Sequence, residues 1–168
     1  MDFSRLRKWE AIGALGAALG ALALFLLPWY SVDPSVPGRT VGNAAYLSSN
    51  WICGKGDLHC TGFETFPLMR WVLILFGIAP IVLAYIVVRG HKTSYPPGEI
   101  TMTVGIVGFV LIAYNGLLFK PGSGSAEIGV SLAWGYWMAL LVGILIGFAG
   151  FMRSQEGQHR VRKAPGNV

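Results

Sequence analysis

Charge is scarce in this sequence, and it is absent from four long apolar stretches. Asp, Glu, Lys and Arg make up 12% of the 168 residues, whereas hydrophobic residues make up 54%. Globular domains usually carry about 25% charged residues, so we expect no sizeable soluble domain. The uncharged stretches, which also lack His, are 11–29, 71–88, 100–119 and 128–152.

The sequence also lacks the patterns that mark common catalytic and binding sites. No Ser-x-Gly elbow lies near any of the three His residues. No Gly-rich turn is followed by the Lys-Ser pair of a phosphate-binding loop. The chain has only two Cys, which is too few for a Cys-based metal site without other ligands. We therefore expect a protein that is not an enzyme, with no catalytic residues, no cofactor and no bound metal.

The four apolar stretches predict membrane-spanning helices. About 20 helical residues cross a hydrocarbon core that is about 30 Å thick. A helix satisfies its own backbone hydrogen bonds inside lipid. We expect an all-α fold, a single four-helix membrane bundle over residues 1–152 with a large outer loop at 30–66. The basic segment 153–168 is predicted to be a disordered cytoplasmic tail.

The distribution of the positive charges predicts the orientation in the membrane. The net charge is +5, and most Lys and Arg fall in the N-terminal lead, the 89–99 connection and the C-terminal segment. Lys and Arg flanking membrane spans stay on the cytoplasmic side. We therefore expect both termini in the cytoplasm and a multi-pass protein of the plasma (inner) membrane. Because the charge is explained by topology, the bilayer is the expected partner and nucleic acid is not.

The first span resembles a secretory signal peptide in its basic start and apolar run. Ala21-Leu22-Ala23 even has the small-x-small form of a cleavage site. Cleavage there would leave a bare apolar start, and the run continues to Trp29, which is long enough to span. We favour an uncleaved signal-anchor.

The two cysteines, Cys53 and Cys60, both fall in the predicted outer loop. Thiols pair in oxidising compartments outside the cytoplasm. Their spacing across the turn 54–57 favours a disulfide that closes a small β-hairpin, with a stabilisation of roughly 2–3 kcal/mol. Two alternatives remain open at this point: a redox-active pair, which lacks the Cys-x-x-Cys spacing, and a zinc site that includes His59.

Small residues recur at helical spacing within three of the spans. They allow close backbone approach, either within one bundle or against a second copy or a partner helix. The candidate packing residues are Gly13, Gly16, Ala17, Gly20, Gly105, Gly108, Gly143 and Gly147.

A few polar side chains lie within the spans. Tyr85, Thr103 and Asn115 are the candidates to line a path in an oligomer. Threonines near a helix end can instead bond their own helix, and Asn115 is expected to bond across to a neighbouring helix.

The outer loop contains the aromatic residues that could form a contact surface. The candidates are Tyr46, Trp51, Phe63 and Phe66, with burial against the bundle as the alternative role for each. Glu64 flanks the start of the second span, and with Arg70 it could form a charge pair there.

Two families resemble the chain. Four spans with inner termini, Trp29 near the start of the outer loop, and Trp51 followed by Cys53 and Cys60 are similar to the claudin and peripheral-myelin-protein superfamily. That resemblance implies a disulfide-pinned sheet that makes contacts outside the cell. The chain departs from it: Ser49-Asn50 stand where the family has Gly-Leu, and both the Trp–Cys and the inter-cysteine spacings are shorter.

The second and closer resemblance is to small four-helix membrane proteins of high-GC bacteria. Those proteins carry a Pro-Trp-Tyr-Ser stretch, as at 28–31, and an aromatic-Glu-x-Phe stretch, as at 63–66. This resemblance implies a bacterial plasma membrane and no particular activity.

Taken together, these features predict a membrane protein that acts by contact. The lead hypothesis is a scaffold, assembly or accessory subunit that binds a membrane-protein partner or a second copy of itself. One alternative is a pore or transport subunit within an oligomer. A third is a membrane redox or lipid-handling enzyme that uses the two cysteines.

Overall fold

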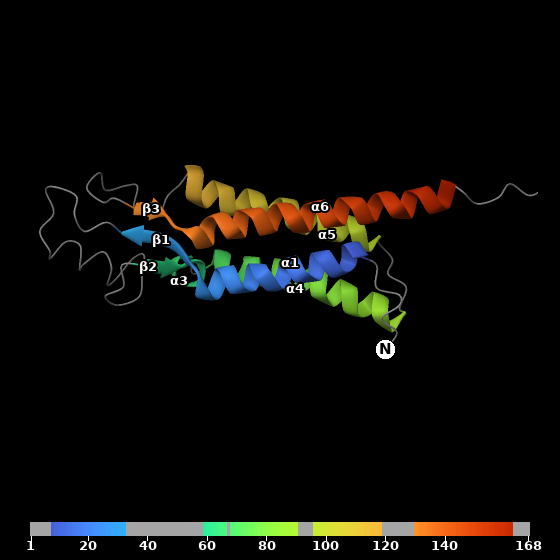
Figure 1. Ribbon diagram of the computed structural model, residues 1–168, viewed down its shortest axis with the longest axis horizontal. Helices are drawn as coiled ribbons and strands as arrows, with labels where there is room; N and C mark the ends of the chain where they lie inside the picture. The colour runs from blue at the N-terminus through green and yellow to red at the C-terminus, as the bar shows by residue number, and fades with distance from the viewer. Residues whose placement is uncertain (1–7, 33–58, 67, 91–95, 119–129, 163–168) are drawn as a thin grey trace, which may run out of the picture.

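Four long helices lie side by side along the molecule (Figure 1). The computed structural model describes residues 8–32, 59–66, 68–90, 96–118 and 130–162. Each of the four helices is long and apolar enough to cross a membrane, so the expected set of long apolar helices is confirmed. They are α1 (Lys8–Leu26), α4 (Met69–Arg89), α5 (Pro97–Ala113) with its π-helical continuation η2 (Tyr114–Leu118), and α6 (Trp134–Arg162).

A three-stranded antiparallel sheet closes one end of the bundle, which we call the sheet end. The strands β1 (Pro28–Val32), β2 (His59–Thr61) and β3 (Val130–Leu132) have the order β2-β1-β3. Each strand adjoins a long helix: β1 follows α1, β2 leads through the short helix α3 (Gly62–Thr65) into α4, and β3 precedes α6. The sheet therefore ties together three segments that are distant in sequence.

The sheet corrects two of the predicted helix boundaries. The first span was expected to reach Trp29, but α1 ends at Leu26 and Pro28 begins β1. The fourth span was expected from Ile128, but 130–132 form β3 and α6 begins at Trp134. Pro cannot continue a helical hydrogen-bond ladder, and Trp, Tyr and Val favour strands. An apolar sequence alone does not separate these short strands from the helices beside them.

The turn 54–57 of the predicted β-hairpin lies outside the described residues. Of the residues on either side of that turn, the structure describes β2, which pairs with β1. The rest of the predicted hairpin lies outside the described residues.

The prediction of a disordered tail from 153 onward is wrong for its first part. Helix α6 continues to Arg162, well past the predicted end of the span. The guanidinium of Arg153 forms an ion pair with Glu10 of α1 at 2.7 Å, and the Glu10 side chain is only 7% exposed. This contact holds the extension against α1 at the end opposite the sheet, which we call the far end.

Glycines let α5 and α6 approach backbone to backbone. A Cβ atom built on Gly105 would overlap the backbone of Gly147, and one on Gly150 would overlap that of Met102. Between α1 and α6 the fit is looser, since a Cβ on Gly16 would lie 3.0 Å from the Ile146 side chain. The other predicted packing residues also lie at helix contacts or are buried: Gly13, Ala17, Gly20, Gly108 and Gly143.

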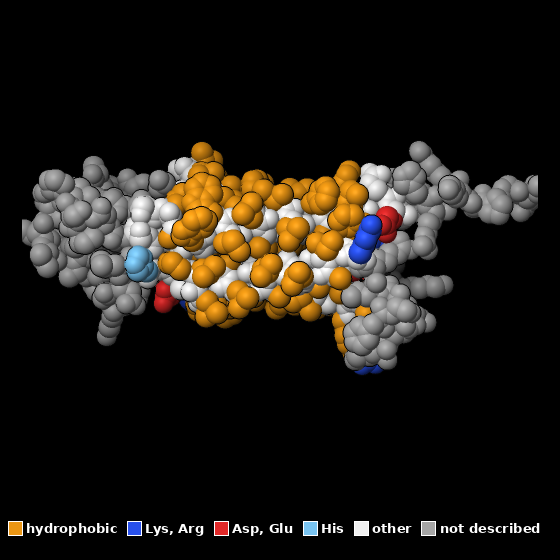
Figure 2. Space-filling model, in the orientation of Figure 1, with side chains coloured by type: hydrophobic (Ala, Val, Ile, Leu, Met, Phe, Trp, Pro, Cys, Tyr) orange, Lys and Arg blue, Asp and Glu red, His pale blue; other side chains and the backbone are white. Residues whose placement is uncertain are grey.

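The surface of the bundle is apolar in its middle and charged at its ends. Figure 2 shows hydrophobic side chains covering the central part of the visible face, with Lys, Arg, Asp, Glu and His toward the two ends. The large exposed side chains of this belt include Leu15, Leu75, Ile106 and Leu141. Such an apolar surface is suited to contact with the hydrocarbon core of a bilayer and not to contact with water.

Candidate contact site at the sheet end

A fully buried aromatic cluster joins the sheet to the bundle. Trp29 and Tyr30 of β1, together with Tyr136 of α6, have at most 1% of their surface exposed. The Trp29 and Tyr136 rings meet edge to face, with centroids 6.1 Å apart. The Trp29 indole Nε1 donates to the carbonyl oxygen of Ala23 at 2.8 Å, which folds the chain back onto α1. The sheet is therefore packed onto the core of the bundle through these side chains.

Side-chain donors reach two backbone carbonyl oxygens where α5 passes into the π-helical turn η2. The Tyr30 hydroxyl donates to the Asn115 carbonyl, and the Tyr136 hydroxyl donates to the Ile112 carbonyl, both at 3.2 Å. A buried carbonyl without a donor is costly, so these tyrosines compensate for the irregular backbone. Gly116 makes the contact sterically feasible, because a Cβ there would overlap the Tyr136 ring.

The predicted intramembrane polar residues do not come together. The Asn115 amide donates to the Leu111 carbonyl oxygen at 2.9 Å and to the Met69 sulfur atom of α4 at 3.0 Å, so it does bond to a neighbouring helix as expected. Thr103 is exposed and donates to the Glu99 carbonyl of its own helix, as expected of such threonines. Tyr85 is also exposed, with the Arg89 guanidinium over its ring. These side chains line no common path within the described bundle.

The entrance to α4 is built by a capping box and a stacked arginine. The Glu64 carboxylate accepts from the backbone N–H of Thr61 at 2.9 Å, and the Thr61 hydroxyl accepts from the Glu64 N–H at 3.3 Å. Arg70 instead lies over the Phe63 ring, with 4.6 Å between guanidinium carbon and ring centroid. Among the described contacts the suggested Glu64–Arg70 pair is therefore replaced by two separate interactions.

Phe63 and Phe66 pack inward, as the burial alternative expected. Both are partly buried against the cluster that contains Trp29 and Cys60. Tyr46 and Trp51, the other two candidates for the contact loop, lie outside the described residues, as does Cys53.

Cys60 is fully buried and is not a free thiol. Because Cys53 lies outside the described residues, the Cys53–Cys60 bridge stays a prediction. Within the described residues, no group of three or more His, Cys, Asp or Glu is placed to hold a metal ion.

An open groove runs beside the sheet, and sequence reasoning did not identify it. Its volume is about 470 Å³, and Pro28, Ser31, His59, Leu132, Ala133, Trp134 and Trp137 line it. Trp134 is 80% exposed although it adjoins the buried Tyr136 cluster. The hydroxyls of Ser31 and Ser131 lie 2.7 Å apart across the β1–β3 pair and fix the register beside the groove. The groove thus presents two tryptophans on a rigid base.

Burial also changes the pKa of one side chain in the sheet, Tyr30. It raises the pKa of the Tyr30 phenol well above its ordinary value of 10.0, and the neighbouring Tyr136 raises that pKa further. Tyr30 therefore stays neutral and keeps donating to Asn115 through the physiological pH range.

No protein-family model and no curated protein sequence matches the chain.

Proposed function

We propose that the protein is a non-enzymatic multi-pass protein of the plasma membrane that works by contact, as a scaffold, assembly or accessory subunit. Its sheet end would face outward and would bind a membrane-protein partner or a second copy of the chain. The sheet, its buried aromatic anchor and the groove beside it support a binding platform. The orientation is supported by the basic residues Lys8, Arg89 and Arg153 near the far end, since basic flanks favour the cytoplasm.

The exposure of Trp134 is the observation that carries this proposal. Tryptophan is enriched in the energetic centres of interfaces, where a rigid side chain enters a partner's pocket. Trp134 and Trp137 stand at the groove, on a base held by the Tyr30 and Tyr136 hydrogen bonds. Tryptophan also anchors proteins at the headgroup layer, so the experiment must separate a protein contact from a lipid contact.

The proposal includes a disulfide between Cys53 and Cys60. Cys60, in β2, is buried in the same cluster as Trp29. A bridge from there would close the short segment between the two cysteines and add a covalent restraint next to β2. This matches the contact role implied by the claudin and peripheral-myelin-protein resemblance.

A photo-crosslinking amino acid at position 134 tests the contact role in intact membranes. We expect the amino acid at position 134 to form covalent adducts with a protein. The same amino acid at Leu141, which is 62% exposed in the apolar belt of the same helix, should give lipid adducts only. Mass spectrometry of the adduct separates a second copy from another protein. A Trp137→Ala change should lower the protein adduct at 134 about tenfold if the groove is the contact.

Two results would overturn the proposal. One is lipid as the sole adduct at position 134 in native membranes. The other is ion or solute flux through liposomes that contain only the purified chain, which would favour the pore alternative. A tag at Val168 that is accessible outside intact cells would overturn the orientation.

A further inference from the structure

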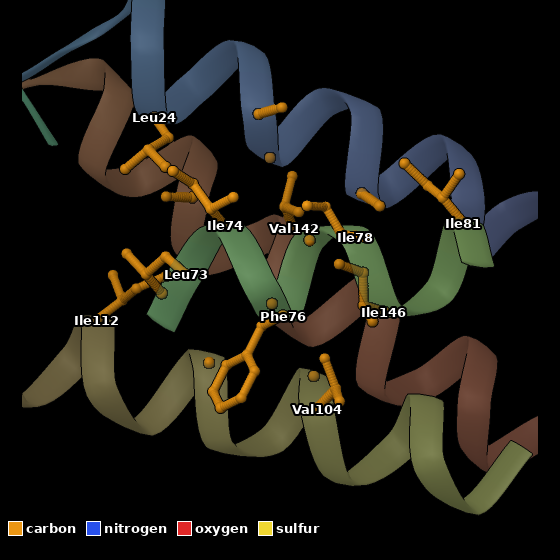
Figure 3. A pocket seen from close by; sticks show the side chains of 18 of the residues that line it. Leu24, Leu73, Ile74, Phe76, Ile78, Ile81, Val104, Ile112, Val142 and Ile146 are labelled. Atoms are coloured by element: carbon orange, nitrogen blue, oxygen red, sulfur yellow. The ribbon is translucent and has the colours of Figure 1, made fainter. Parts of the chain in front are cut away.

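A cavity inside the bundle lies between all four long helices. Its volume is about 300 Å³, at the lower end of the range of about 300–1,000 Å³ for ligand pockets. Figure 3 shows side chains from each helix pointing into it, among them Leu24, Ile74, Val104 and Ile146. Among its lining residues only Trp29 has a polar side-chain atom, and the Ala23 carbonyl already accepts that N–H.

Water is a poor occupant for this cavity. A buried water needs two to four polar partners, and the lining offers none that is free. An empty cavity of this size would also forfeit dispersion contacts along its whole lining. The occupant should therefore be apolar.

The cavity opens onto the apolar belt of the bundle. Phe25, Ile78 and Ile81 line it and yet are 44%, 47% and 46% exposed, so they form its mouth. A Cβ atom added at Gly77, also in the lining, would meet no atom within 4 Å. A chain from the bilayer could therefore enter directly from the hydrocarbon region.

Arg70 places a positive charge above this mouth. It lies on the same face of α4 as the lining residues Leu73, Ile74, Gly77, Ile78 and Ile81, at steps of three and four residues. Its guanidinium lies over Phe63, whose ring centroid is 5.0 Å from that of Phe25 at the mouth.

The donors of Arg70 are poorly satisfied. Its Nε is buried and has no hydrogen-bond partner, and Nη1 makes one long bond of 3.4 Å to the Phe63 carbonyl. The nearby Glu64 carboxylate accepts through Oε2 from the backbone N–H and the hydroxyl of Thr61. Guanidinium groups match phosphate oxygens in a two-pronged geometry, so a phosphate is the complementary group.

We infer that this cavity binds one acyl chain of a phospholipid from the leaflet at the sheet end, with the lipid phosphate held by Arg70. The positions of the cavity and of Arg70 along α4 fit such a lipid. The acyl chain would lie in the cavity at hydrocarbon depth, and the phosphate would lie at Arg70, nearer the sheet end. The bound lipid fills the gap that α4 leaves beside α5 and α6, and so becomes part of the bundle's packing.

Native mass spectrometry of the full chain released from phosphatidylglycerol nanodiscs tests this. We expect one retained lipid on the unaltered protein. Gly77→Leu should reduce retention about tenfold, because it adds a side chain to the cavity lining at a position where a Cβ meets no atom within 4 Å. Arg70→Gln should do the same by removing the charged donor. Ala21→Phe provides a second block from α1, at an exposed lining residue.

Matched controls are available on the same helix. Leu75→Phe adds bulk outside the cavity at a side chain that is 65% exposed, and Arg89→Gln removes a charge at the far end. Both should retain the lipid. Circular dichroism and size-exclusion profiles check that each variant is folded.

Three results would overturn the inference. Equal lipid retention in folded Gly77→Leu and Ala21→Phe would remove the cavity from the site. Equal retention in Arg70→Gln would remove the phosphate contact. If inorganic phosphate alone stabilises the lipid-free protein as much as the phospholipid does, and Arg70→Gln abolishes both effects, the ligand is a free anion and no acyl chain is bound.

Discussion

The hydroxyl of Tyr30 donates a hydrogen bond to the Asn115 carbonyl oxygen, 3.2 Å away, and so joins β1 to the π-helical end of α5. The two residues are 85 positions apart in sequence. The sheet end and the helix bundle are therefore parts of one packed unit. A partner that binds the groove beside the sheet would act on the bundle directly, because the same strand carries both contacts.

Removal of this hydroxyl should destabilise the protein. Tyr30→Phe keeps the ring in place but leaves the Asn115 carbonyl without its side-chain donor, which costs about 1–2 kcal/mol. Thermal unfolding in detergent measures the loss. Tyr85→Phe is the control, because that ring is 48% exposed and should unfold like the unaltered chain. Equal melting temperatures for the two variants would mean that water or lipid replaces the donor.

Stability should also fall in alkaline solution. The folded state holds the Tyr30 pKa above its ordinary value of 10.0, so above that pH the unfolded chain loses the phenolic proton while the folded chain keeps it. The unfolded state then binds fewer protons, and the free energy of unfolding decreases as pH rises. The contribution of Tyr30 to the melting temperature should be constant well below pH 10 and should decline as pH rises through and above 10. Tyr30→Phe should flatten that decline, and an unchanged slope in the variant would assign it to other groups.

Two glycine substitutions should have opposite effects. Gly105→Ala places a Cβ against the Gly147 backbone, so α5 and α6 must separate, at a cost of about 1–3 kcal/mol. Gly77→Ala adds the same methyl group where no atom lies within 4 Å, and a helical Gly→Ala change should stabilise by about 0.5–1 kcal/mol. Chemical unfolding of both variants in the same detergent provides the comparison. A similar loss of unfolding free energy in both variants would mean that the close contact at Gly105 does not set the effect of the substitution.

The long helices could be predicted because the requirement that sets them is local. An uncharged run such as 100–119 has no good alternative to a helix in lipid, and α5 with η2 indeed covers most of it. The glycine positions followed from the same logic, since close helix packing needs residues without side chains.

The sheet and the ion pair could not be predicted because their partners are far apart in sequence. β1 pairs with β3 across about a hundred residues, and strands of three to five residues carry too little periodicity to be identified. Glu10 and Arg153 are 143 positions apart, and each alone reads as an ordinary flanking charge. The π-helical turn was not predicted either, because the tyrosine that donates to its Asn115 carbonyl comes from β1, far away in sequence.

The state of the cysteines can be tested by alkylation with and without prior reduction. If Cys53 and Cys60 are bridged, alkylation of the denatured but unreduced chain adds no mass, and reduction exposes two reactive thiols. Cys60→Ser should then lower stability by about 2–3 kcal/mol, through loss of the short closed loop. Two thiols that react without reduction would show that the bridge is absent.

Glu10→Gln should loosen the far end of α6. The Glu10 carboxylate is 7% exposed and accepts from both Nε and Nη2 of Arg153, at 2.8 and 2.7 Å. An amide cannot neutralise that partly buried guanidinium, so we expect a loss of about 1–3 kcal/mol. Glu99→Gln is the matched control, an exposed carboxylate in the first turn of α5 that should cost at most about 0.5 kcal/mol.

Hydrogen exchange locates the effect of Glu10→Gln. Faster exchange should be confined to α6 beyond Arg153, because that segment extends past the described apolar span and is held by the ion pair and by the Trp9–Glu156 hydrogen bond of 2.9 Å. The same region in Glu99→Gln should exchange at the original rate. If the exchange rates beyond Arg153 are the same in Glu10→Gln and in the unaltered chain, the ion pair does not stabilise this extension of α6.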